Sequence, residues 1–323
     1  MKKELGLFVM LIVLCACAQG FDPDRIFLTS TNIQNLCRLI GMFGIFSIGL
    51  GIVIITGGID LSAGSMFALL GVILAGMLVD AQWFWPLAII GILAVGMLIG
   101  GFHGFLVTRV KMQPFIVTLC GLLLYRGLAR YLAGDVTKGF GTAEGFETLQ
   151  RLATMNVGWV PMSFLVLIVI AVIMWLVLHR SVYGRYLFAV GRNEEAARFS
   201  GVNTRLVMAS AYVLAGLLTG VSAILFSFYT NSVSPSSHGN FYELYGIAAA
   251  VLGGCSLRGG EGTVLGIIIG TALLQVLQNV VNLLGIDSSL NFAVMGAVIL
   301  IGVVVDILVK DWHSKRRVAM PTE

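Results

Sequence analysis

Long apolar runs, interrupted at short intervals, constrain this chain more than any other feature. Only 11% of its residues are charged, against about a quarter in a soluble domain. A helix that crosses a bilayer needs about 20 mostly apolar residues. This length predicts ten membrane helices, at 5–21, 39–56, 64–79, 83–107, 115–133, 159–178, 206–228, 244–256, 263–284 and 291–309. The predicted fold is an all-α polytopic membrane protein, with one membrane-embedded domain over residues 1–323.

The third and eighth apolar runs, 64–79 and 244–256, are short for a crossing helix and could be half-helices. A glycine-rich break adjoins each of them, at 57–65 and 253–262, and each break has a leucine three residues after a Gly-Gly pair. Paired interruptions of this kind predict an internal repeat around a transport path, because irregular backbone at membrane depth needs protein or a water-filled cavity beside it. Two tight turns that need glycine only for their geometry are the alternative.

The distribution of lysine and arginine predicts the orientation, because short cytoplasmic loops carry an excess of both. With the N-terminus inside, 14 of the 20 Lys and Arg residues fall on inside segments, and five of these are arginines in the stretch 179–205. The prediction is N-in and C-in, which agrees with an even number of helices. It places 179–205 in the cytoplasm as a loop and leaves a polar outer loop at about 134–158.

The N-terminus has a second interpretation. Lys2 and Lys3 precede an apolar run that reaches Cys15 and Cys17, a pattern that also fits a lipoprotein signal peptide. Cleavage before Cys17 would remove the first helix and leave nine. We expect the first helix to be retained, because the two lysines then anchor it on the inside and the number of helices stays even.

The stretch 179–205 contains a short helix whose two ends are marked in the sequence. Asn193 is a suitable N-cap, because its side-chain oxygen can accept a hydrogen bond from the first turn. Glu194 and Glu195 put negative charge at the positive end of the helix dipole. Gly201 stands where the helix should end, because glycine takes the left-handed conformation at low cost. These signals predict a small helix held outside the membrane; a charged, solvated loop is the alternative.

Polar side chains within the apolar runs are candidates for a solute path, because they are costly to place in lipid. Asp60 and Ser62 lie in the first glycine-rich break. A polar stripe with spacings of three or four residues follows the helix at 263–284. The stripe consists of Gln275, Gln278, Asn279 and Asn282. It could line a path for a polyhydroxyl solute or join two helices.

Three further charged residues lie near predicted outer helix ends. Glu243, beside Tyr242 and Tyr245, could hydrogen-bond a sugar or anchor the start of its helix. Arg126 and Arg130 are one helical turn apart, and we expect their guanidinium groups to extend to the membrane interface.

Several kinds of chemistry have no motif in the sequence. No GxxxxGK[ST] loop is present, so the chain has no nucleotide-hydrolysis motif of its own. Neither HExxH nor Gly-x-Ser-x-Gly occurs, and the four histidines and five cysteines lack metal-ligand spacing. We therefore expect no catalytic residue, no metal, no cofactor and no nucleic-acid partner. A transporter is favoured over an intramembrane hydrolase, which would need a clustered nucleophile and base.

Four motifs together resemble a known family. They are GGIDLSAGS at 57–65, KMQPFIVTLCGLLLYRGLA at 111–129, GRNEEAARFSGVN at 191–203 and ELYGIAAAVLGGCSLRGGEGTVLG at 243–266. In this order they resemble the permease subunits of bacterial sugar ABC importers of the ribose, xylose and arabinose type, over residues 35 to 309. The resemblance implies an inner-membrane protein with ten or so helices that imports ribose or another pentose by alternating access.

The resemblance also implies partners and a role for the short helix. The partners are a cytoplasmic ATP-binding subunit that uses the ATP, a periplasmic sugar-binding protein and a second permease copy, most simply as a homodimer. Such permeases dock a coupling helix on the ATPase, often with Glu-Ala-Ala followed by three residues and a glycine. The residues assigned to coupling are Asn193, Glu194, Glu195, Ala196, Ala197 and Gly201; the proline of the longer motif is missing.

The sequence leaves two questions open beside this interpretation. A secondary transporter or channel that works alone is the alternative function, although no series of carboxylates suggests a proton or sodium relay. The sequence names neither the sugar nor the composition of the dimer.

Overall fold

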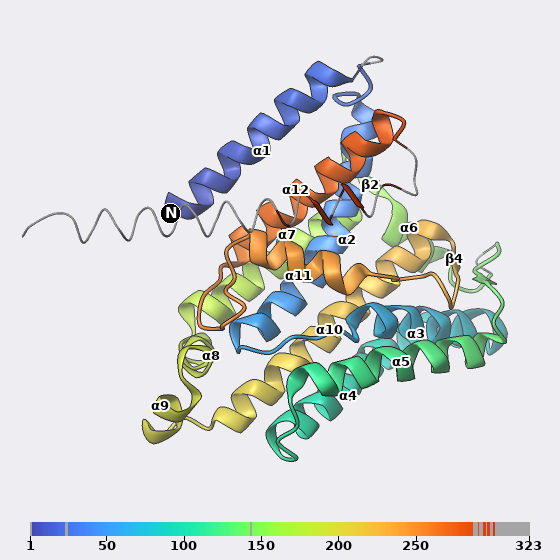
Figure 1. Ribbon diagram of the computed structural model, residues 1–323. Coiled ribbons are helices and arrows are strands. Elements are labelled where there is room, and N and C mark those ends of the chain that lie inside the picture. The colour runs from blue at the N-terminus through green and yellow to red at the C-terminus, as the bar shows by residue number, and fades with distance from the viewer. Residues whose placement is uncertain are drawn as a thin grey trace, which may run out of the picture.

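The computed structural model describes residues 2–22, 25–142 and 144–286, with isolated positions between 290 and 300. Helices dominate it (Figure 1). Seven helical segments of the described chain are long and apolar enough to cross a membrane. These are α2 (Ser30–Ile55), α3 with η1 (Ala63–Ala75 and Gly76–Asp80), α4 (Trp85–Thr108), α5 (Pro114–Ala133), α7 with η2 (Met162–Trp175 and Leu176–Arg180), α10 (Thr204–Thr230) and α12 (Val264–Leu283).

Two shorter apolar helices, α1 (Lys2–Phe21) and α11 (Tyr242–Leu252), pack against α12. Helix is therefore present at each of the first nine predicted runs, and the chain is a polytopic helical membrane protein. The predicted tenth helix, 291–309, lies almost entirely outside the described residues.

Some predicted boundaries are wrong for physical reasons. α2 begins at Ser30 and not at 39, because its first turns are polar and are stabilised by a cap: the Thr29 hydroxyl accepts a hydrogen bond from the Asn32 N–H at 3.4 Å. The eighth predicted helix ends at Leu252 and not at 256, because the chain turns at Gly254, where φ is +96°. Such a φ is easily adopted only by glycine.

The connecting segments contain structure that the apolar pattern did not predict. The helices α6 (Glu147–Thr154), α8 (Val182–Arg192) and α9 (Glu194–Phe199) lie between membrane segments. Two antiparallel ladders pair β1 (Lys138–Gly139) with β4 (Ser232–Val233), and β2 (Asn156–Val157) with β3 (Val160–Pro161). The fold is therefore helical with two minimal strand pairs, and not strictly all-α.

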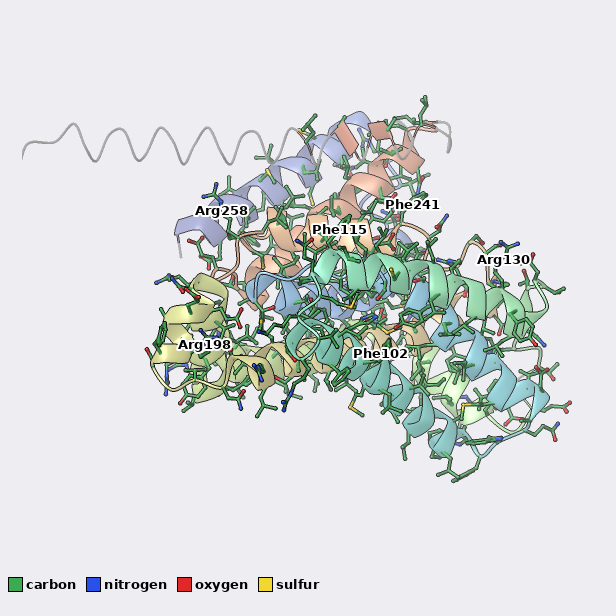
Figure 2. All side chains as sticks on the ribbon, turned by 60° about the horizontal axis from the view of Figure 1, so that its bottom comes forward. Phe102, Phe115, Arg130, Arg198, Phe241 and Arg258 are labelled. Atoms are coloured by element: carbon green, nitrogen blue, oxygen red, sulfur yellow. The ribbon has the colours of Figure 1, made fainter. Side chains whose placement is uncertain are left out.

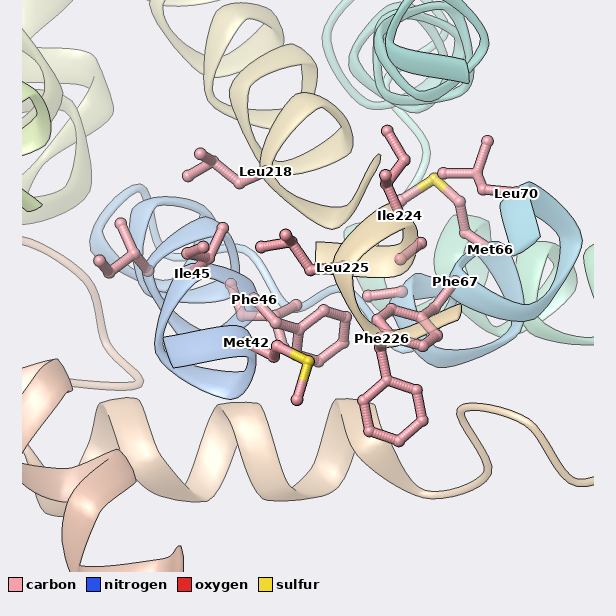
Figure 3. Packing of buried hydrophobic residues seen from close by; sticks show 14 of the residues in the cluster. Met42, Ile45, Phe46, Met66, Phe67, Leu70, Leu218, Ile224, Leu225 and Phe226 are labelled. Carbon is pink, nitrogen blue, oxygen red and sulfur yellow. The ribbon is translucent and has the colours of Figure 1, made fainter. Parts of the chain in front are cut away.

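α2 and α10 form the centre of the bundle, and α10 packs along both α2 and α4. In Figure 3, Phe46 of α2, Phe67 of α3 and Phe226 of α10 converge in the core. The contact between α4 and α10 depends on glycine, since a Cβ at Gly96 would lie 2.5 Å from the Gly216 carbonyl oxygen. Small residues of this kind let helices approach in lipid, where the hydrophobic effect does not drive their association.

The bundle has two distinct ends. One end carries α8, α9 and the break at 253–262, and we call it the arginine-rich end; Figure 2 places Arg198 and Arg258 there and Arg130 toward the other end. The opposite end carries α6 and the strand pairs. Between the ends, leucines such as Leu98 and Leu123 are 72% and 69% exposed. Their exposure fits a surface that faces lipid.

Candidate functional site

α9 is a six-residue helix that is closed at both ends by local hydrogen bonds. The Asn193 side chain accepts a hydrogen bond from the Ala196 N–H at 2.9 Å, which confirms the predicted N-cap. At the other end, the Val202 N–H donates to the Ala197 carbonyl at 3.1 Å, and Gly201 has a φ of +85°. This pairing with a left-handed glycine is a Schellman motif. The predicted stop at Gly201 is therefore also confirmed.

Gly201 ends α9, and the other five residues assigned to coupling divide into two groups. Asn193, Glu194 and Ala197 hold α9 in place: the Glu194 carboxylate accepts a hydrogen bond from the Thr204 hydroxyl at 3.1 Å, and Ala197 is buried. Glu195 and Ala196 are exposed, as Asn193 and Glu194 are, but their side chains make none of these contacts. The second group is free to meet another molecule.

Phe199, the last residue of α9, is the residue that the motif did not single out. Its side chain is 82% exposed, and the Arg198 guanidinium lies 5.6 Å from its ring centre. α9 lies at the extreme of the arginine-rich end, beyond the start of α10 (Figure 1). A large apolar side chain in that position is not used in the described chain's own core.

α8 fixes the base of α9 to the bundle. Leu187 and Val190 are buried in the main core, and the Tyr183 hydroxyl lies 2.9 Å from the Ser210 hydroxyl of α10. Burial raises the pKa of Tyr183, so its hydroxyl stays neutral and available for this hydrogen bond.

The end of α8 meets both glycine-rich breaks, backbone against backbone. The Gly260 N–H donates to the Ile55 carbonyl at 2.8 Å, and a Cβ at Gly259 would lie 2.5 Å from the Gly191 carbonyl oxygen and 2.9 Å from the Gly57 nitrogen. A Cβ at Gly191 would overlap the Ile55 carbonyl. We call Gly57, Gly191, Gly259 and Gly260 the glycine junction. The two breaks therefore touch, and α9 extends from the point where they do; the internal repeat stays a prediction.

A cleft of about 490 Å³ opens beside the glycine junction. α9 contributes Glu195 and Arg198 to its lining, and the loop between α4 and α5 contributes Lys111. The first break reaches the same cleft at Gly58, next to the buried Tyr212. A displacement of α9 would therefore change a space that extends to the first break.

The first break runs as irregular backbone from Gly57 to the start of α3. Asp60 is 3% exposed, and one of its carboxylate oxygens accepts from both the N–H and the hydroxyl of Ser62, at 2.9 and 2.6 Å. The Ser65 hydroxyl in turn donates to the Ser62 carbonyl at 2.8 Å. Asp60 and Ser62, two of the predicted path residues, are therefore joined to each other.

A tyrosine and a histidine lie beside this break. The Tyr125 hydroxyl of α5 lies 2.8 Å from Nε2 of His103 on α4, and both side chains are buried. A Cβ at Gly121 would lie 2.9 Å from the Ser62 Cβ and 3.0 Å from that same His103 nitrogen. The break is therefore enclosed by protein at membrane depth, as irregular backbone in a bilayer has to be.

The start of α3 meets the start of α11. A Cβ at Gly64 would overlap the Gly239 carbonyl and the Glu243 carboxylate, and a Cβ at Gly239 would overlap the Gly64 carbonyl. α11 begins directly after Phe241, whose φ is +63°. With 11 residues, α11 is about 16 Å long, roughly half of the 30 Å hydrocarbon core. It is a half-helix, as the short eighth run allowed.

Arg126 does not extend to the interface as expected. Its guanidinium donates to the carbonyls of Pro235 and His238, at 2.9 and 2.8 Å. These two carbonyls belong to the segment that leads from α10 into α11. The expectation was wrong because nothing in the local sequence shows that this segment folds back against α5.

The amide stripe on α12 lies in different surroundings from Asp60. Asn279 and Asn32 exchange two hydrogen bonds, at 3.0 and 2.8 Å, and so join α12 to α2. Gln275 is 5% exposed and Asn282 is exposed. α12 packs on α1, α2 and α11, whereas α3, at the end of the first break, packs on α4, α5 and α10. The structure shows Asn279 as a link between helices; the path role of the stripe stays a prediction.

The described residues contain no group of three or more His, Cys, Asp or Glu side chains that could hold a metal ion. What they do contain is a membrane bundle with a capped helix at one end, next to α8, whose last turn touches two glycine-rich breaks. This combination is that of a membrane transport protein.

Residues 32–303 match the family model described as "Branched-chain amino acid transport system / permease component", and the chain belongs to this family. It is a transporter permease subunit, a multi-pass protein of the inner membrane. It is 38% identical to the ribose import permease protein RbsC of Bacillus subtilis, over 94% of this chain and 92% of that one.

Two further relatives are also sugar permeases. The chain is 35% identical to the ribose import permease protein RbsC of Escherichia coli K12, over 94% of this chain and 93% of that one. It is 30% identical to the xylose transport system permease protein XylH of the same strain, over 94% and 92%. The resemblance seen in the motifs is confirmed. No solved structure matches the chain.

Proposed function

We propose that this chain is the membrane permease of an ATP-driven importer for a monosaccharide, ribose or another pentose. Two of the three relatives named above are ribose import permeases, and the third is a xylose permease. The chain has no nucleotide-hydrolysis motif, so a separate ATP-binding subunit supplies the energy. The other partners are a periplasmic sugar-binding protein and a second copy of this chain.

One observation carries the proposal: α9 is capped at both ends, and its base is fixed at the glycine junction. A helix of six residues would not be stable alone, but here its caps and the buried Ala197 make it rigid. Movement of a docked ATPase is therefore passed to Gly57 and Gly259 with little loss, as alternating access requires. In this arrangement the arginine-rich end is cytoplasmic, in agreement with the positive-inside pattern.

Phe199 is the anchor of this docking surface. Phenylalanine and arginine are both enriched in the buried cores of interfaces relative to the rest of the surface. Arg198 lies against the Phe199 ring, and Arg185, Arg192 and Arg205 are also exposed. The surface therefore fits a partner with an apolar pocket and an acidic rim.

The solute path passes the first break and the half-helix α11. Asp60 and Ser62 lie where the backbone leaves helical geometry inside the bundle, which is where transporters of broken-helix design bind their solutes. Gln275, Asn279 and Asn282 contribute a neutral hydrogen-bonding stripe at the side of α11 and α12. The homodimer encloses the complete path between its two copies.

To test the proposal, the chain is isolated from its native membrane together with the ATPase that accompanies it. The complex is then reconstituted into lipid vesicles. We expect ATP-dependent uptake of labelled ribose in the presence of the binding protein. Uptake that continues without ATP while an ion gradient is maintained, with no ATPase in the isolated complex, would establish a stand-alone transporter and contradict the proposal.

Two matched variants test the anchor. Phe199→Ala removes the exposed ring of α9, and Tyr131→Ala removes an equally exposed ring, also 82%, from the opposite end of the bundle. We expect the first to reduce retention of the ATPase at least tenfold and the second to leave it unchanged. Equal retention by both variants, or equal loss, would show that Phe199 is not the anchor.

A further inference from the structure

The junction of α3 and α11 contains more polar groups than its packing uses. Glu243 is 6% exposed, and its carboxylate lies against Gly64 at the start of α3. His238 is 8% exposed, and its Nε2 has no hydrogen-bond partner among the described residues. Arg126 is close enough to act electrostatically on Glu243. A buried polar nitrogen without a partner costs free energy, so its retention points to a ligand.

Aromatic rings cover the same junction. The ring of His238 lies 5.3 Å from that of Phe67 and 5.2 Å from that of Phe226, and Tyr242 lies 5.6 Å from each of these phenylalanines. Phe43 contacts Phe226 and Tyr242 in turn. These five rings close the space above the Gly64–Gly239 contact; Figure 3 shows Phe67 and Phe226 within this packing.

The junction lies beside the middle turns of α2. Phe43 is close to the midpoint of α2, whose 26 residues extend for about 39 Å and so exceed the hydrocarbon core of about 30 Å. Intramembrane ionisable groups are rare and are usually associated with a solute or ion pathway. Backbone contact at Gly64 and Gly239 leaves no room for a solute in this state, so the junction is closed.

We propose that the α3–α11 junction is a closed binding station for a neutral polyhydroxyl solute, with Glu243 and His238 as its hydrogen-bonding groups. The solute separates Gly64 from Gly239, donates a hydroxyl hydrogen bond to the Glu243 carboxylate and satisfies Nε2 of His238. A hydroxyl both donates and accepts, so it suits either tautomer of that histidine. The apolar face of the sugar ring then lies on Phe67 or Tyr242. This inference rests on the proposed function and adds these residues to it.

The first test uses Glu243→Gln and His238→Phe in the reconstituted complex with its ATPase. Glu243→Gln keeps the shape of the side chain but removes its charge and one acceptor oxygen, and His238→Phe keeps an aromatic ring but removes both ring nitrogens. We expect ribose uptake to fall at least tenfold while ATP hydrolysis and retention of the ATPase persist. Wild-type uptake in both variants would overturn the proposal.

The second test follows the closed junction without changing Glu243 or His238. Ser65→Cys, with the five native cysteines replaced by alanine, places a thiol next to Gly64 at a position that is 1% exposed. We expect a water-soluble methanethiosulfonate reagent to label it at least tenfold faster during ATP-driven uptake of ribose than at rest. Ser227→Cys, which is equally buried on α10, should stay unreactive. Equal labelling of Ser65→Cys in both conditions would overturn the proposal even where a polar variant fails to fold.

The two levels of inference fail in different ways. Absence of ATP-dependent uptake by the unaltered complex contradicts the proposed function itself. Suppose instead that the unaltered complex takes up ribose normally, that the Glu243 and His238 variants take it up equally well, and that Ser65→Cys does not react. This result contradicts only the binding station.

Discussion

α9 and the α3–α11 junction are both short interruptions of the membrane bundle, but they are held together in opposite ways. α9 is stabilised by contacts within ten residues, from the Asn193 cap to the Thr204 hydrogen bond on Glu194. The α3–α11 junction joins Gly64 to Gly239, which are far apart in the sequence. A local motif can keep its shape while the bundle around it moves, whereas a junction between distant segments can open. The difference agrees with the two roles proposed above, a coupling helix at α9 and a gate at the α3–α11 junction.

The glycine junction connects these two places, and Gly191→Ala is the change with the largest expected effect. The new methyl group would overlap the Ile55 carbonyl, which is backbone and cannot rotate away. We expect a loss of about 3 kcal/mol of stability, the upper end for overpacking, seen as a lower melting temperature in detergent. Gly127→Ala is the control, since a Cβ there meets nothing within 4 Å. Equal melting of the two variants would show that the contact is not tight.

Gly201→Ala tests whether the structure of α9 can change without a change in the glycine junction. The left-handed φ of +85° costs a residue with a side chain about 1–2 kcal/mol. We expect the Val202 amide, which donates to Ala197, to exchange hydrogen roughly tenfold faster. The Gly260 amide, which donates to Ile55, should keep its rate. Faster exchange at both amides would show that α9 is not stabilised by local contacts alone.

Asn193→Ala removes the other cap and should have a smaller effect. Loss of the bond to the Ala196 N–H costs about 1 kcal/mol, so exchange at that amide should rise about fivefold and binding of the ATPase should weaken. Asn193→Asp retains an acceptor oxygen and should behave as the unaltered chain. If the aspartate variant is as impaired as the alanine variant, the side chain of Asn193 has a role beyond capping.

Asn279→Leu has the smallest expected effect and separates a helix link from a solute path. The reciprocal bonds to Asn32 predict a loss of about 0.6 kcal/mol, typical of such pairs in membranes. Asn282→Leu, at an exposed position one turn later, should leave stability unchanged. A large fall in ribose uptake by Asn279→Leu at unchanged melting temperature would instead support its place in the path.

The sequence predicted those features whose causes are local. Apolar run length predicted helix at nine positions, since crossing a bilayer fixes the number of residues needed. Asn193 and Gly201 predicted both ends of α9, because helix caps are formed by residues adjacent to the helix they close. The motifs of the breaks predicted the family. The apolar pattern does not extend to the first turns of α2, because their residues are polar and a cap at Thr29 stabilises them instead.

Only the tertiary structure decided which segments that are distant in the sequence contact one another. No local pattern shows that Gly191 touches Ile55, that Arg126 binds the carbonyls before α11, or that Glu243 lies against Gly64. These contacts depend on how helices approach one another, and in lipid that approach is set by small residues spread along the whole chain. The sequence by itself determined a bundle of membrane helices with one rigid helix outside it. The packing of glycine on glycine decided where the two breaks meet α8, and where α3 meets α11.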